Sequence, residues 1–125
     1  MIVGLGNDLI RVSRIERVLA RHGQRFLDRL LTEDEQADLP EGAQRANRVA
    51  KSFAAKEALV KALGTGFRGV DHRDCGVRRT AIGAPSLQFS AALQALLDQR
   101  GISHAHLALT DDGDWVLATV ILEQH

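Results

Sequence analysis

The stretch A-Q-R-A-N-R-V-A-K-S-F-A-A-K-E-A-L-V-K-A-L at 43–63 decides the fold of this chain. It contains no proline or glycine, and Gly64 follows where a C-cap glycine belongs, so it predicts one long helix. Between 53 and 63 the residues are apolar nearly all round, which is typical of a buried helix. One row of this helix carries only small side chains, at Ala50, Ala54, Ala58 and Ala62. Such a row lets a neighbouring element approach closely.

Strands are predicted at both ends of the chain, outside this helix. The first covers 2–10 and contains Gly4 and Gly6, and glycines inside a strand often mark the close approach of another backbone or a ligand. Further strands are predicted at 74–79, 86–89, 104–110 and 115–122, the last two around the turn D-D-G-D at 111–114. Strands at both chain ends with helices between them predict an α+β fold, an antiparallel sheet with a long central helix.

Capping residues predict two shorter helices. Ser13 with Glu16 has the sequence pattern of a capping box, which places the start of the first helix at Arg14. Thr32 with Glu35 repeats this pattern and predicts a short acidic helix.

The composition limits the class of protein. A chain of 125 residues fits one compact domain, 1–125, with a single core. Its formal net charge is zero, so affinity for an anionic partner must come from local patches. The lone Cys75 excludes an internal disulfide and a multi-cysteine zinc site, and it suits a reducing compartment. No apolar stretch approaches the roughly 20 residues of a membrane span, and the N-terminus lacks the features of a signal peptide. We therefore expect a cytoplasmic protein that binds no membrane.

Two acidic residues lie among apolar neighbours and are candidate metal ligands. Glu57 and Lys61 are one turn apart on one face of the long helix, and one interpretation is an ordinary helix-surface ion pair. Asp8 ends the segment G-L-G-N-D, where one interpretation is a turn or cap residue. If Asp8 and Glu57 instead meet in space, they supply the hard oxygen ligands that suit Mg²⁺.

The residues around Glu57 suit a phosphate group. Lys61 could neutralise one phosphate, and the backbone N–H groups of Gly64, Thr65 and Gly66 could approach another. The segment is not a P-loop, because the Lys-Ser/Thr ending is absent. The residues by themselves therefore indicate a metal-assisted phosphate or pyrophosphate site.

Arginines recur every three or four residues in the first predicted helix, at Arg14, Arg17, Arg21 and Arg25, and we call these four residues the arginine ridge. In an otherwise neutral chain the ridge indicates a docking face for an acidic partner, and the alternative is a solvated face with no partner. Nucleic acid is a poor candidate, because few aromatic side chains are present for base stacking.

Two residues near the last predicted hairpin are further candidates for the site. His106 could line a pocket if its strand borders the metal site. Asp111 could reach the site from the end of the same strand. With no third ligand identified, a metal site at His104 and His106 is not expected.

Four segments resemble one known family. G-L-G-N-D-L-I-R-V-S-R-I-E at 4–16 and F-A-A-K-E-A-L-V-K-A-L-G-T-G at 53–66 are similar to the two signature motifs of the holo-(acyl-carrier-protein) synthases, and L-T-E-D-E at 31–35 and A-T-V-I-L-E at 118–123 also match. The resemblance implies a small bacterial 4′-phosphopantetheinyl transferase with the fold of that family. It also implies a homotrimer with coenzyme A bound in clefts between subunits.

The resemblance assigns roles to the matching residues. Asp8 and Glu57 would bind Mg²⁺, and Lys61 would stabilise charge on the pyrophosphate. A serine of the apo carrier protein would attack the phosphate that bears the pantetheine arm, and adenosine 3′,5′-bisphosphate would leave. Either a metal-bound water or Glu57 would take the serine proton. The acidic carrier would dock on Arg14, Arg21, Arg25 and Phe26. With the candidates from the residues themselves included, the residues expected to contact coenzyme A are Lys61, Gly64, Thr65, Gly66, Arg45, Arg48, His106 and Asp111.

The chain departs from the family pattern at two positions. Ser52 stands where relatives usually have arginine, and Ala84 stands where a lysine is usual. Both departures concern how the nucleotide phosphates are held, and Arg45 and Arg48 are the candidates to compensate.

A second hypothesis remains at this point. The chain could be a non-enzymatic module that binds an acidic protein or nucleic acid through the arginine ridge. Binding alone would need none of Asp8, Glu57 and Lys61, so these three residues separate the hypotheses. Whether the carrier serves fatty-acid or polyketide assembly does not follow from the sequence.

Overall fold

The computed structural model describes residues 1–80 and 82–125. The elements follow one another in the order β1 (Ile2–Arg11), α1 (Val12–His22), α2 (Gln24–Leu30), α3 (Glu33–Ala37), α4 (Gln44–Leu63), the 3₁₀ turn η1 (His72–Asp74), β2 (Cys75–Arg79), β3 (Pro85–Phe89), α5 (Ala91–Gln99), β4 (Ile102–Asp112) and β5 (Trp115–Gln124). The predicted α+β class is confirmed, and each predicted strand is present with its ends shifted by two residues or fewer.

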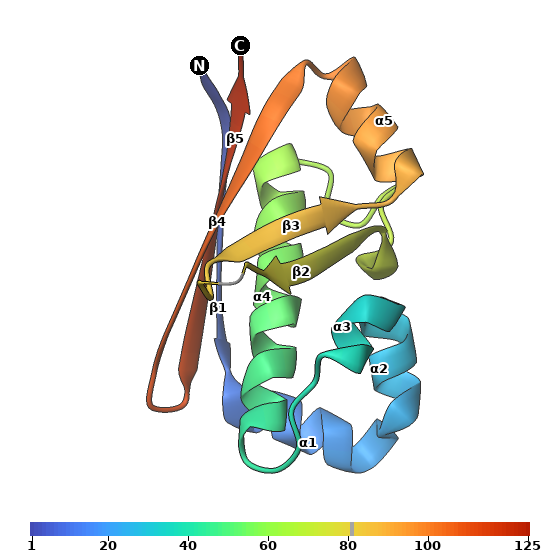
Figure 1. Cartoon of the computed structure of the whole chain (residues 1–125), viewed down its shortest axis with the longest axis vertical. Coiled ribbons are helices and arrows are strands. Elements are labelled where there is room, and N and C mark those ends of the chain that lie inside the picture. Colours follow the sequence, from blue (N-terminus) through green and yellow to red (C-terminus); the bar gives the residue numbers. More distant parts are fainter. Residues whose placement is uncertain (81) are drawn as a thin grey trace.

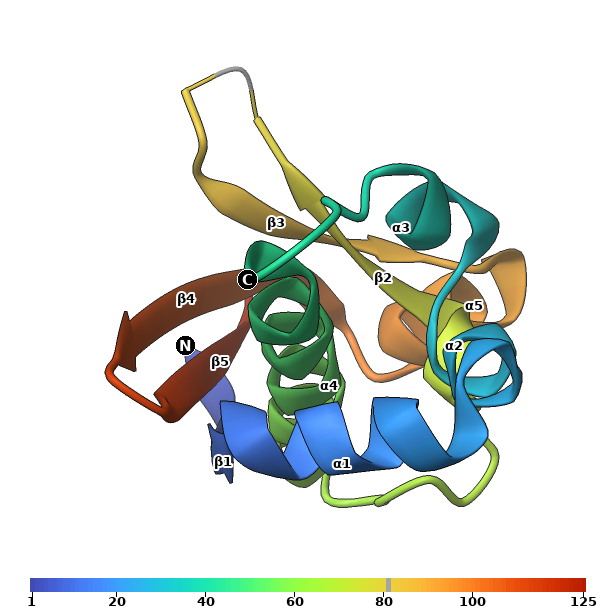
Figure 2. The same ribbon diagram turned by 90° about the horizontal axis from the view of Figure 1, so that it is seen from below.

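Helix α4 lies at the centre of the molecule. The strands β1, β5 and β4 form an antiparallel sheet in that order, and this sheet covers one side of α4 (Figure 1). The antiparallel hairpin of β2 and β3 crosses a second side, and α1 passes beneath (Figure 2). The termini lie together at one end of the sheet (Figure 1), where the Met1 amino group donates to the Gln124 carbonyl at 2.7 Å.

The core forms where α4 meets the three-stranded sheet. Alternate residues of β5 point toward α4 and are almost fully buried, namely Val116, Ala118, Val120 and Leu122. The buried residues of α4 occur nearly all round the helix, as predicted from its apolar sequence. A helix that is buried on all sides takes its stability from packing rather than from its own propensity.

The small residues of α4 let strand β1 pack directly on the helix backbone. A Cβ atom added at Gly6 would collide with the Ala58 carbonyl oxygen, and one added at Gly4 would collide with the Ala62 carbonyl oxygen. The predicted close approach at the alanine row is therefore confirmed. Gly4 and Gly6 of β1 are the residues that lie against this row.

The predicted start of the first helix is wrong. Helix α1 begins at Val12, and Ser13 lies inside the helix and is not its cap. The cap comes from Asp114 in the β4–β5 turn. Its carboxylate accepts hydrogen bonds from the Ser13 backbone N–H at 2.9 Å and the Ser13 hydroxyl at 2.6 Å, and its carbonyl accepts the Val12 N–H at 2.8 Å. A remote carboxylate thus satisfies the first N–H groups of the helix, so no local capping box is required.

The other helix ends follow the sequence pattern. Thr32 and Glu35 form the predicted capping box of α3. Helix α4 ends at Gly64, whose φ of 77° lies in the left-handed region that favours glycine. Gly23, with a φ of 53°, separates α1 from α2. In the described part of the chain no helix has the length and apolar character needed to cross a bilayer.

Candidate functional site

The structure brings the two predicted metal ligands to one place, between β1 and α4. Asp8 pairs with Ala118 in the sheet, so its side chain lies on the face that covers α4. Lys61 Nζ is 3.0 Å from Asp8 Oδ1 and 3.1 Å from the Asn7 carbonyl oxygen. The Asp8 side chain is 15% exposed and the Lys61 side chain 51% exposed, so the pair lies at the edge of solvent.

This contact excludes one of the two interpretations of Lys61. In the described residues Lys61 forms its ion pair with Asp8 and not with Glu57, its neighbour one turn back on the helix. The ordinary helix-surface pair is therefore not formed. Strand β1 supplies the counter-ion because its glycines let it approach α4 so closely.

Glu57 is half-buried beside this pair. Burial raises the pKa of its carboxyl, and the nearby negative charge of Asp8 raises it further. The positive charges of Lys61 and Arg14 oppose the rise in pKa. The Asp8 carboxylate is thus close enough to disfavour the charge of Glu57, which is a situation that a divalent cation relieves.

The donor set fits Mg²⁺ bound together with a phosphate. Asp8 and Glu57 offer carboxylate oxygens, and Mg²⁺ sites of this kind use one or two carboxylates with phosphate and water oxygens. Among the residues that the structure describes, no group of three or more His, Cys, Asp and Glu side chains is arranged to hold a metal ion. A metal at Asp8 and Glu57 would therefore need oxygens from the substrate or from water.

The glycine exit of α4 differs from the prediction. The backbone N–H groups of Gly64, Thr65 and Gly66 all donate to the Val60 carbonyl, at 3.0, 3.2 and 3.3 Å. These three N–H groups close the helix end, so in this structure they are not free for a phosphate. The Thr65 hydroxyl donates to the Gly66 carbonyl at 2.7 Å.

Arg45 and Arg48 lie away from Asp8 and Glu57 within one copy of the chain. Arg48 precedes Glu57 by nine residues, which places it about 13 Å along the helix and half a turn around it. Burial lowers the pKa of Arg48, and so does the charge of the adjacent Arg79. Arg45 instead contacts the Pro40 carbonyl at 3.5 Å.

The two candidates on β4 are also separated from this site within one copy. His106 pairs with Ile121, so it lies on the sheet face turned away from α4, where its Nε2 is 2.8 Å from Glu123 Oε1. Asp111 faces α4 but contacts the first half of that helix, with Asn47 Nδ2 at 3.1 Å and Lys51 Nζ at 3.5 Å.

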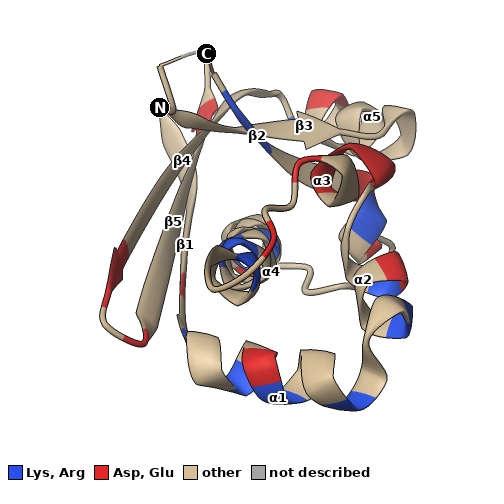
Figure 3. Ribbon diagram, turned by 60° about the horizontal axis from the view of Figure 1, so that its bottom comes forward, with Lys and Arg blue, Asp and Glu red and all other residues tan. Residues whose placement is uncertain are grey.

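The predicted docking residues form an exposed surface on α1 and α2. Arg14, Arg21 and Arg25 are exposed and Phe26 is half-buried. Figure 3 shows Lys and Arg at intervals along these two helices. The ridge bends at Gly23, where α1 ends and α2 begins. Arg14 lies near enough to influence Glu57, so this surface leads to the candidate metal site.

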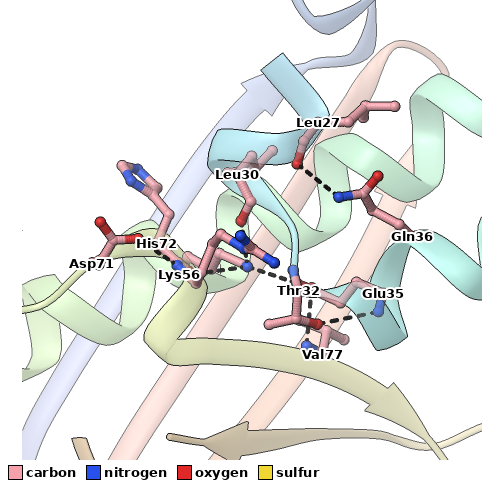
Figure 4. Close-up of polar contacts among 10 residues, drawn as sticks. Leu27, Leu30, Thr32, Glu35, Gln36, Lys56, Asp71, His72 and Val77 are labelled. Carbon is pink, nitrogen blue, oxygen red and sulfur yellow. Dashed lines mark hydrogen bonds and ion pairs between the residues drawn. The ribbon is translucent and has the colours of Figure 1, made fainter. Parts of the chain in front are cut away.

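Sequence reasoning missed a buried ion pair beside the site. Lys56 and Glu35 are almost fully buried, and Lys56 Nζ lies 2.7 Å from Glu35 Oε1 (Figure 4). A lysine between Ala55 and Glu57 in an otherwise apolar helix was the available signal, because a buried lysine needs a partner.

Comparisons with known proteins place this geometry in a family. Residues 4–120 match the model of the 4′-phosphopantetheinyl transferase superfamily. The chain is 41% identical to a holo-(acyl-carrier-protein) synthase of Neisseria meningitidis over 125 residues, 99% of this chain and all of that protein. A Neisseria meningitidis crystal structure of that synthase shares 42% identity with a TM-score of 0.94, over 99% of this chain and 100% of the other. A Bacillus anthracis synthase in complex with CoA (3′,5′-ADP) shares 35% identity with a TM-score of 0.84, over 100% of this chain and 99% of that one. The fold predicted from the resemblance is confirmed.

Proposed function

The chain belongs to the 4′-phosphopantetheinyl transferase superfamily, and we propose that it is a holo-(acyl-carrier-protein) synthase. It transfers the 4′-phosphopantetheine arm of coenzyme A to a serine of an apo acyl carrier protein and releases adenosine 3′,5′-bisphosphate. The relatives with this name match the chain over almost its full length, and one solved relative is a complex with CoA (3′,5′-ADP).

One observation carries the proposal: Asp8, Glu57 and Lys61 converge from two segments about 50 residues apart in the chain. Two carboxylates and one ammonium group at the edge of solvent suit a pyrophosphate with its metal ion. Asp8 and Glu57 would hold Mg²⁺, which when bound would neutralise pyrophosphate oxygens and polarise the phosphorus.

The other steps of the transfer would depend on Lys61 and Glu57. Lys61 would leave Asp8 and stabilise the negative charge that develops on the leaving bisphosphate. The new bond joins the serine oxygen to the phosphorus that bears pantetheine, and the bond from that phosphorus to the nucleotide side of the pyrophosphate breaks. The serine proton would pass to Glu57 or to a water molecule of the site.

An assembly of several copies would complete the site. Arg45, Arg48, His106 and Asp111 lie away from Asp8 within one copy, and we propose that they contact coenzyme A from a neighbouring subunit of a homotrimer. The exposed apolar residues on the outer face of β1, such as Leu5 and Leu9, support an assembly. A cytoplasmic location stays a prediction from the single cysteine. The carrier would serve fatty-acid or polyketide assembly.

The alternative of a non-enzymatic binding module is not favoured. It would use the arginine ridge for an acidic protein or nucleic acid, and it leaves Asp8, Glu57 and Lys61 without a role. The family match covers the residues of the site as well as the ridge.

The decisive experiment follows the mass of a carrier protein. The chain is incubated with apo acyl carrier protein, coenzyme A and Mg²⁺, and the carrier is examined by mass spectrometry for the added phosphopantetheine arm. A parallel reaction with EDTA tests the metal. Failure to load any of several bacterial carriers would refute the synthase, and full activity in EDTA would refute the metal.

A further inference from the structure

The buried ammonium group of Lys56 connects three segments that are distant in the sequence. Its side chain is 1% exposed. Its Nζ donates to the Leu30 carbonyl at 2.6 Å, to Glu35 Oε1 at 2.7 Å and to the His72 carbonyl at 2.8 Å (Figure 4). All three donors of the ammonium group are therefore used, by the end of α2, by α3 and by η1.

Glu35 completes this network on the other side. Its Oε1 also accepts the Thr32 N–H at 3.0 Å, and its Oε2 accepts the Val77 N–H at 3.0 Å. In the described residues no buried side-chain nitrogen or oxygen lacks a hydrogen-bond partner. A buried ion pair is often no more stabilising than apolar residues of similar volume, so stability alone is a weak reason for its presence.

The two carbonyl groups that Lys56 binds belong to two segments lining one pocket. Leu30 lies on the α2 segment of the pocket, together with Phe26 and Arg29. His72 lies on the η1 segment, and its ring stacks on Phe67 with 3.8 Å between centroids. The cavity is open and has a volume of about 570 Å³, and its other lining residues are Phe53, Asp71 and Arg73.

This pocket continues the predicted docking surface. Phe26 and Arg29 also line a second cavity with His22 and Arg25, so the arginine ridge leads directly into the pocket. Two phenylalanines and a leucine line it, with arginines from both segments. An acidic protein that presents an apolar side chain next to its carboxylates fits this combination of surface and charge.

We propose that Lys56 is a positioning residue, which ties both segments of the pocket to α4 and so sets how an acidic carrier protein docks relative to Glu57. The inference rests on the proposed function and names a further part of its carrier site. Lys56 directly precedes Glu57 on α4, so the network connects the docking pocket to the helix that carries the catalytic carboxylate. A purely structural ion pair would change stability and leave the recognition of both substrates alone.

The test is the double variant Lys56→Met with Glu35→Gln, which removes both charges together and leaves no unpaired buried charge. The carrier KM is expected to rise at least about tenfold, while the coenzyme A KM stays within about twofold of wild type. A lower melting temperature with both KM values unchanged would overturn the inference, and so would an equal rise in both.

A matched control is the double variant Arg78→Met with Asp34→Asn. It removes an ion pair of 3.1 Å at the surface between α3 and β2, two elements that the hydrogen bond from Val77 to Glu35 also joins. Both KM values should remain those of the wild type. A rise of the carrier KM in this control equal to that in the buried variant would overturn the special role of Lys56.

If the double variant at Lys56 and Glu35 fails to fold, a measurement on the wild type still tests the inference. Hydrogen exchange is followed with and without apo carrier, in the absence of coenzyme A. Slower exchange is expected in 26–31 and 71–75 as well as in α1, and protection limited to α1 would overturn the pocket as part of the docking surface. A wild type that loads no carrier refutes the proposed function and this inference with it. An active wild type whose hydrogen exchange in 26–31 and 71–75 does not change on carrier binding refutes the inference alone.

Discussion

At the scale of single residues, the ion pair of Lys61 with Asp8 is the contact that says most about function. Its ammonium group forms an ion pair with the Asp8 carboxylate across the interface of β1 and α4, although Glu57 is nearer in the sequence. An exposed ion pair of this kind contributes little to stability, typically below about 1 kcal/mol. The convergence of Asp8, Glu57 and Lys61 is therefore better explained by what the three groups bind than by what they stabilise.

We expect Asp8→Ala and Glu57→Ala each to reduce kcat/KM by at least about a hundredfold, because each removes one carboxylate ligand from a site that offers two. Loading of apo carrier at saturating coenzyme A measures the loss. The exposed Glu16→Ala on α1 serves as the control and should keep its activity. Full activity in either carboxylate variant would contradict the metal assignment.

The cap that Asp114 provides for α1 makes a pH-dependent contribution to stability. The hydrogen bond from the Ser13 side chain, with that from its backbone N–H, lowers the pKa of Asp114. A lowered pKa in the folded state means that the stabilisation is complete above the unfolded pKa, about 3.9, and is lost as the pH falls through the folded pKa.

Urea unfolding of wild type and Asp114→Ala should therefore differ most at pH 7 and progressively less below about pH 4. Asp112→Ala, in the same hairpin, is the control, and at pH 7 it should change the free energy of unfolding less than Asp114→Ala does. A difference between wild type and Asp114→Ala that is constant from pH 7 to pH 3 would show that the carboxylate does not act as the cap.

At the scale of the elements, the contact between β1 and α4 places the site. The glycines of β1 lie against the carbonyl groups of Ala58 and Ala62, and both helix positions flank Lys61 in the sequence. Because Asp8 follows Gly6 by two residues, it lies on the same face of the strand. The close approach that packs the strand on the helix thus also brings Asp8 to Lys61.

Gly6→Ala should destabilise the chain by about 3 kcal/mol, because the added methyl group would collide with the backbone carbonyl of Ala58, which cannot rotate away. Denaturant unfolding measures the change. Gly76→Ala is the matched comparison, since its nearest contact is the Thr32 hydroxyl oxygen at 3.3 Å, and it should cost less. Equal effects of the two substitutions would argue against the close approach.

The exposed ridge on α1 is expected to act on one substrate only. Reversing Arg14 and Arg21 to Glu should raise the carrier KM by at least about tenfold, because like charges facing each other cost several kcal/mol. The KM for coenzyme A is measured in the same reactions as the internal control. An equal rise in both values would count against the ridge as a docking face.

At the scale of the whole molecule, the three-stranded sheet has one covered and one open face. Leu5 and Leu9 of β1 point away from α4 and are 60% and 58% exposed, opposite Ile121 and Leu117 of β5. The pair of Asn7 and Thr119 lies between these two apolar pairs, and large exposed apolar side chains grouped on one sheet face are typical of an interface. The proposed trimer would cover this face and would bring residues such as His106 to a neighbouring copy.

Leu5→Lys should prevent assembly, because it places a charge in the centre of this apolar face. Sedimentation velocity measures the loss of the larger species. Ala92→Lys on the exposed side of α5 adds the same charge elsewhere and should leave the assembly intact. A trimer that persists in Leu5→Lys would mean that copies meet through another surface.

Features that depend on local patterns could be predicted from the sequence. Helix periodicity, the alanine row and Gly64 predicted α4 and its burial, and residue chemistry selected Asp8, Glu57 and Lys61. Contacts between distant groups became visible in the folded chain: Asp114 caps α1 from 101 residues away, and Lys56 binds carbonyls of two other segments. The N–H groups after α4 are used by the helix end. Such partners depend on how the elements stack, and the sequence near each residue carries little information about contacts so distant along the chain.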